Sequence, residues 1–188
     1  MQVQNRTKWS SRERTAHPSG RHDELGAWSK RLAKASTVSA LRAATGISDE
    51  EALRTLGELG FTPDTVRMLH LVPLVHVAWS EGGMTRRERK LIEDLALLRG
   101  VRYGSPAFTA LAEWFERPLP EGHFEKCLQV IRASLDAMPD RARSETVRSI
   151  VFQCTQVATA SRESWAERDC ISTREHDVLE HIVGVLRG

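Results

Sequence analysis

The chain has 188 residues, of which 40% are hydrophobic, so it can bury one sizeable core and forms at most two domains. Its 27 lysine and arginine residues nearly balance 25 acidic residues, and the formal net charge of +2 excludes a protein that coats nucleic acid through its overall charge. The three cysteines, Cys127, Cys154 and Cys170, are odd in number and have no C-x-x-C spacing, so they support neither a disulfide framework nor a zinc knuckle.

The amino-terminal residues 1–22 are polar and have no apolar periodicity, so we predict a disordered tail. Residues 1–36 carry eight basic and three acidic side chains, a net of +5. A solvated tail is favoured over a nucleic-acid contact, since Trp9 is the one aromatic residue among the basic side chains of residues 1–22. No apolar signal-peptide core follows Met1, and the expected location is the cytoplasm.

From residue 23 onward the chain is predicted to be helical, with a first helix over residues 23–47 and a helical domain over residues 48–188. The capping-box pattern at Ser48–Glu51 opens a short helix that ends at Gly60. A longer helix begins at Thr62-Pro63-Asp64 and runs to about Ser80. It is apolar on nearly all sides, so we expect it at the centre, bent at Pro73. Thirteen residues separate Arg67 from Glu81, too few for a membrane span.

Five further amphipathic helices are predicted between Thr85 and Leu186, and no hairpin signal interrupts them. Three of them begin at recognisable caps, namely Thr85–Glu88, Ser105-Pro106 and Ser172–Glu175. Their expected apolar positions are Leu91, Ile92, Leu95, Leu98, Phe108, Leu111, Ala112, Phe115, Phe124, Cys127, Leu128, Ile131, Leu135, Met138, Val147, Ile150, Val151, Cys154, Val157, Ala158, Val178, Leu179, Ile182, Val183 and Leu186. The prediction is an all-α, single-domain bundle of about eight helices.

One motif occurs twice, at Gly82–Glu93 and at Asp169–Glu180, each time after a long apolar helix. This pattern predicts a duplicated helix-turn-helix. Capping boxes explain the shared hydroxyl and glutamate without any ligand. A calcium loop is the sharper alternative, but it needs several carboxylates. The corresponding ligand positions supply only Glu81 in the first copy and none in the second.

The segment Val77–Glu88 resembles the V-A-x-A-D-G-x-[IV]-[ST]-x-x-E signature of TerB-like proteins, which are bacterial tellurite-resistance and stress-associated helical domains. A co-chaperone amino-terminal domain is related to them. The resemblance covers roughly residues 49–186, with Glu81 where the family usually has Asp and a charged insertion at Arg162–Arg168 in the second copy. It implies an interaction module with protein partners, no cofactor and no catalysis.

Two other functions remain open at this stage. Four carboxylates in the two turns, Glu81, Glu88, Asp169 and Glu175, form a candidate binding site for a metal if the turns converge. The basic tail is a candidate for phosphate contacts with nucleic acid, although nucleic acid is not the expected partner. No nucleophile motif or phosphate-binding glycine loop supports an enzyme.

Overall fold

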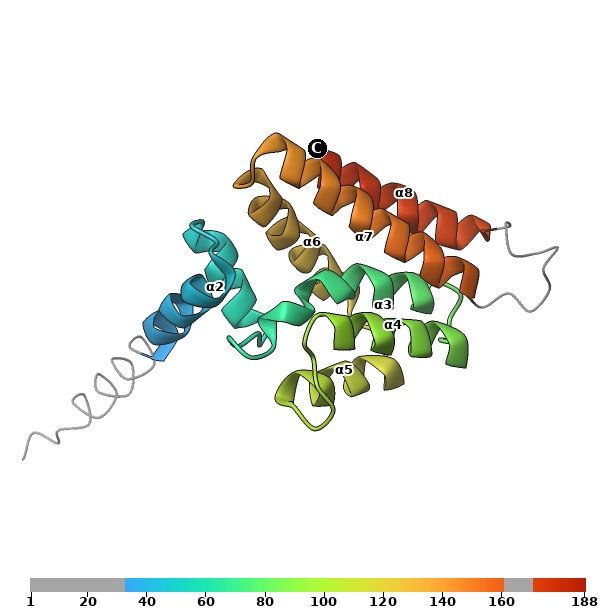
Figure 1. The fold of residues 1–188 in the computed structure, drawn as a ribbon, viewed down its shortest axis with the longest axis horizontal. Coiled ribbons are helices and arrows are strands. Elements are labelled where there is room, and N and C mark those ends of the chain that lie inside the picture. The colour runs from blue at the N-terminus through green and yellow to red at the C-terminus, as the bar shows by residue number, and fades with distance from the viewer. Residues whose placement is uncertain (1–32, 161–170) are drawn as a thin grey trace, which may run out of the picture. The chain divides into compact units, whose positions relative to one another are not determined.

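The computed structural model describes residues 33–160 and 171–188, and this part of the chain is helical without a strand (Figure 1). Residues 33–45 are helical. The following elements are α2 (Glu50–Glu58), the 3-10 helix η1 (Val66–Leu71), α3 (Val72–Trp79), α4 (Arg86–Leu98), α5 (Pro106–Glu116), α6 (Glu121–Asp136), α7 (Asp140–Ala160) and α8 (Thr173–Arg187). The predicted all-α bundle is confirmed. The predicted tail over residues 1–22 lies outside the described residues.

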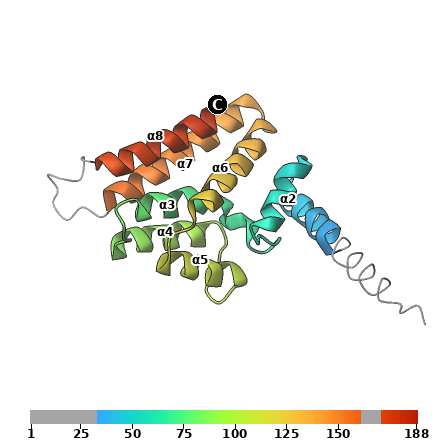
Figure 2. The same ribbon diagram turned by 180° about the vertical axis from the view of Figure 1, so that it is seen from behind.

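Helix α3 lies at the centre of the compact unit Lys34–Gly188, and it contacts α4, α6, α7 and α8. Figures 1 and 2 show α3 drawn between the α7–α8 pair and the α4–α5 pair. Six of its eight residues are buried, namely Val72, Pro73, Leu74, Val75, Val77 and Ala78. An all-round apolar helix can be stable only where other helices cover every side, as predicted. None of the described helices is long and apolar enough to cross a membrane.

The single helix predicted from residue 62 to residue 80 is wrong, because the structure divides it into η1 and α3 at Val72. Pro63 lies in a turn before η1. Pro73 lies in the first turn of α3, where a backbone N–H has no partner inside the helix. The proline therefore begins an α-helix instead of bending one.

The start of α2 also differs from the prediction, since Asp49 and not Ser48 is its N-cap. The Oδ1 atom of Asp49 accepts hydrogen bonds from the backbone N–H of Glu51, at 2.8 Å, and of Ala52, at 3.2 Å. Both residue types cap helices well, and the longer carboxylate reaches two orphan donors.

The prediction that Leu98 belongs to the core is also wrong, because its side chain is 83% exposed. The buried positions of α4 are Glu88, Ile92 and Ala96, four residues apart. At 100° per residue, Leu98 is turned about 200° from Ala96 and so faces away from the core.

Candidate functional site

The turn between α3 and α4 forms the first predicted capping box. Gly82 has a φ of +87°, a conformation that favours glycine, and its N–H donates to the carbonyl of Trp79 at 2.9 Å. The backbone N–H of Thr85 donates to Oε2 of Glu88 at 2.6 Å, and the N–H of Glu88 donates to Oγ1 of Thr85 at 3.3 Å. The two residues thus satisfy each other, as the capping-box pattern predicts.

The start of α8 repeats this arrangement. The N–H of Ser172 donates to Oε2 of Glu175 at 2.8 Å, and the N–H of Glu175 donates to Oγ of Ser172 at 3.2 Å. The two N-cap residues have nearly the same backbone angles, with φ −76° and ψ 162° at Thr85 and φ −66° and ψ 159° at Ser172. The predicted second capping box is therefore confirmed with the same local geometry.

Both capping-box glutamates are buried, which an ordinary helix start does not require. Within residues 33–160 and 171–188, Glu88 and Glu175 are the buried charged side chains, at 3% and 1% exposure. Burial raises the pKa of Glu88; the hydrogen bonds with Thr85 oppose this rise, while the negative charges of Glu175 and Glu81 add to it. Since Glu175 acts electrostatically on Glu88, carboxylates of the two turns lie within interaction range of each other.

Of the four predicted site residues, Glu88 and Glu175 are buried, and the negative charge of Glu175 contributes to the raised pKa of Glu88. Glu81 is exposed in the α3–α4 turn, and Asp169 lies outside the described residues. Among the residues with described positions, no three His, Cys, Asp or Glu side chains are arranged to hold a metal ion. The Oε2 atoms of Glu88 and Glu175 accept backbone hydrogen bonds from Thr85 and Ser172, so each carboxylate has a structural role at the start of its own helix.

Replacing Thr85 or Ser172 by alanine should lower the free energy of unfolding by about 1 kcal/mol each, because one orphan N–H of the first helical turn loses its acceptor. The exchanges Thr85→Ser and Ser172→Thr should preserve stability, since each keeps the hydroxyl. Urea unfolding of the four variants measures both effects. Unchanged midpoints for the alanine variants would show that the hydroxyls do not cap these helices.

Sequence reasoning missed a histidine cluster where α3, α6 and α8 meet. The ring of His76 stacks on Phe124, with centroids 3.6 Å apart and planes 9° from parallel. His181 places Nε2 2.6 Å from Oε1 of Glu125. On the surface of α8, His176 and Glu180 form an exposed i,i+4 pair with Nε2 and Oε1 3.3 Å apart. The cluster forms between helices that are far apart in the sequence, so no short sequence motif predicts it.

His70, at the end of η1, should titrate near pH 4. Burial and the charge of Arg99 lower its pKa from 6.5 to about 4. The folded protein therefore disfavours the imidazolium, so stability is unaffected by His70 above pH 6.5 and falls as the pH decreases toward 4. NMR titration of the imidazole protons measures this midpoint. A midpoint near 6.5 would show that water reaches the ring.

Comparisons of the chain with protein-family models, with curated proteins and with solved structures give no match. The TerB-like resemblance stays a prediction from the motif residues in the two turns.

Proposed function

We propose that this chain is a non-enzymatic interaction module of the TerB-like kind, which binds protein partners in a bacterial stress response or in tellurite or metal resistance. The observation that carries the proposal is the pair of matching capping boxes, each with a buried glutamate. It agrees with the duplicated motif of the resemblance. Backbone hydrogen bonds engage both carboxylates, which favours a structural role for them over general acid-base chemistry.

A partner surface is proposed at the end of α4 and the middle of α7. Leu98 is 83% exposed and Phe152 is 62% exposed, and aromatic side chains such as phenylalanine are enriched in protein interfaces. Their neighbours in sequence, Arg99 and Gln153, form a 2.6 Å hydrogen bond between the two helices. The two apolar side chains are therefore presented by adjoining stretches of chain.

Photo-crosslinking tests this surface directly. A benzoylphenylalanine at position 152 should crosslink a defined protein in the native cells, and the additional change Leu98→Ser should reduce the yield. The same probe at Arg141, a 92% exposed position on the same helix, is the matched control. Equal products at both positions, or none at position 152, would contradict the proposed surface.

A metal-binding role for the two turns is the second candidate, and the electrostatic effect of Glu175 on Glu88 favours it. Calorimetric titration of the full chain with Ca²⁺ and with Zn²⁺ distinguishes the two functions. If the chain is an interaction module, we expect no stoichiometric heat of metal binding that depends on Glu88 or Glu175. A 1:1 heat that Glu88→Gln abolishes would replace the first proposal by the second.

A further inference from the structure

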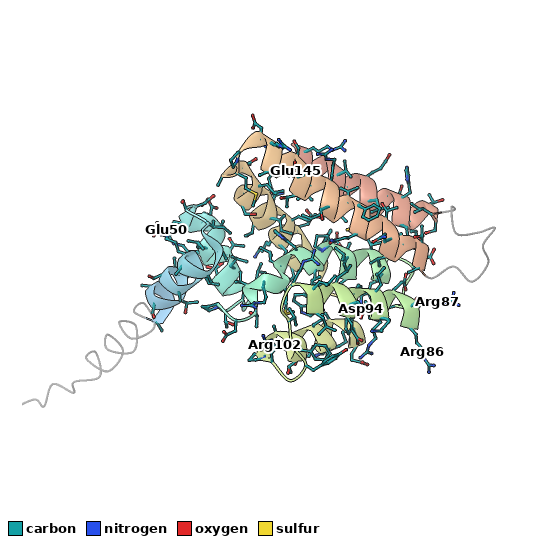
Figure 3. All side chains as sticks on the ribbon, viewed as in Figure 1. Glu50, Arg86, Arg87, Asp94, Arg102 and Glu145 are labelled. Atoms are coloured by element: carbon teal, nitrogen blue, oxygen red, sulfur yellow. The ribbon has the colours of Figure 1, made fainter. Side chains whose placement is uncertain are left out.

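A pocket of about 330 Å³ lies at the other end of α4 from Glu88. His70 of η1 and Arg99 at the end of α4 line it, and α7 contributes side chains that include Glu145, Thr146 and Ser149. Figure 3 labels Glu145 on α7. Elements distant in sequence thus bring a guanidinium, an imidazole and two hydroxyl groups to one pocket.

Arg99 is half-buried and its hydrogen bonds go to neutral acceptors. Its Nη1 donates to the carbonyl of Leu95 at 3.2 Å, and its Nη2 donates to Oε1 of Gln153 at 2.6 Å. Within the described part of the chain no carboxylate forms an ion pair with it, and burial lowers its pKa. A guanidinium has five N–H donors, so these two bonds leave three for another acceptor.

The hydroxyl of Ser149 supplies a second hydrogen-bond donor near Arg99. The Nε2 atom of Gln153 donates to Oγ of Ser149 at 3.4 Å, so Ser149 accepts there and keeps its own proton to donate. The Oγ1 atom of Thr146 already donates to the carbonyl of Ala142 at 2.9 Å. Ser149, Gln153 and Arg99 therefore form a chain of hydrogen bonds that orients the guanidinium.

Among the residues that line the pocket, Arg99 is the cation and Glu145 is the carboxylate, and the described ion pair of Glu145 is with Arg141, not with Arg99. Glu145, on the pocket wall, accepts from Nε of Arg141 at 3.0 Å on the exposed face of α7, which offsets its negative charge. The pKa of His70, near 4, keeps its ring neutral at pH 7, where it offers hydrogen bonds without charge. The negative end of the α4 dipole and the carbonyl of Leu95 stabilise Arg99 only in part.

We propose that this pocket binds a small oxyanion, the carboxylate or phosphate group of a ligand, between the guanidinium of Arg99 and the hydroxyl of Ser149. Arginine matches two oxygens of such a group with parallel N–H donors, and these charge-assisted bonds are strong where water is partly excluded. The proposal does not rest on the buried glutamates, and it shares only the Arg99–Gln153 hydrogen bond with the proposed partner surface.

Calorimetry and NMR on the full chain test the site with inorganic phosphate and with acetate, at an ionic strength held constant with NaCl. At least one of the two anions should bind saturably at one site, and Arg99→Gln should weaken it by about tenfold or more. Arg102→Gln changes an exposed arginine three residues further on, labelled in Figure 3, and should bind like the wild type. Binding of phosphate alone identifies a phosphate ligand, and binding of acetate identifies a carboxylate.

If Arg99→Gln does not fold, the chemical-shift changes of the wild type during titration still test the proposal. Saturable shifts should centre on the amides of Arg99, Ser149 and Gln153, with Arg102 little changed. The proposal is overturned if neither anion binds saturably above chloride, if Arg99→Gln and Arg102→Gln weaken binding equally, or if the shifts centre elsewhere.

Discussion

Replacing Glu88 by alanine should lower the free energy of unfolding by about 2 kcal/mol at pH 7, whereas glutamine at this position should keep it or raise it. Alanine leaves the backbone N–H of Thr85 without its 2.6 Å acceptor. Glutamine retains an acceptor oxygen, completes a capping box equally well and removes a negative charge near Glu175. Urea unfolding of the wild type and the two variants gives the three free energies.

The same variants should differ in their pH dependence. The pKa of Glu88 is raised in the folded protein, so folding favours its protonated form. Its contribution to stability is complete below the ordinary value of 4.5 and is lost as the pH rises through the folded pKa. The advantage of Glu88→Gln should therefore grow with pH above 4.5. The exposed Glu113 provides the matched control, since Glu113→Gln should follow the wild type. If Glu88→Gln also follows the wild type, buried charge at Glu88 is not the cause.

The exchange Phe124→Ala should cost about 3–5 kcal/mol, the largest effect expected for a single substitution here. Phe124 is 1% exposed and stacks on His76, in the region where α3, α6 and α8 pack together. Alanine removes the ring and leaves a cavity that rigid helices fill only in part. Chemical unfolding measures the loss. The exchange Phe152→Ala, at a 62% exposed ring, is the matched control and should cost far less.

NMR titration of His76 gives an independent check of the same substitution. Burial lowers the pKa of His76 in the wild type. Loss of the Phe124 ring should admit water and move this pKa back toward 6.5. An unchanged pKa together with a small loss of stability would show that the packing around Phe124 closes after the substitution.

Features encoded within one or two helical turns could be predicted from the sequence. The boxes at Thr85 and Ser172 depend on groups three residues apart, and both form as predicted. The cap of α2 was predicted one residue too early, at Ser48 instead of Asp49, since the two are adjacent residues that both cap helices well. The division of η1 from α3 could not be predicted either, because a 3-10 helix and an α-helix share the same apolar pattern.

The sites depend on distances between helices that are far apart in the chain, so the sequence could only name candidates. It identified Glu88 and Glu175 but not that both side chains are buried. The sequence did not indicate a binding role for Arg99, because a basic residue at the end of a helix is common and stabilises the helix. Its role follows from Gln153 and Ser149, about fifty residues later, which lie next to it only after α7 packs on α4.

The central place of α3 makes the two copies of the motif inseparable. In the folded chain α3 packs on α7 and α8, and α4 packs on α7, so each copy covers apolar surface of the other. A fragment that ends before α7 would expose much of α3 to water, at roughly 25 cal/mol for each Å² uncovered. The two copies of the motif therefore complement each other in folding, and we expect neither copy alone to fold as a stable unit.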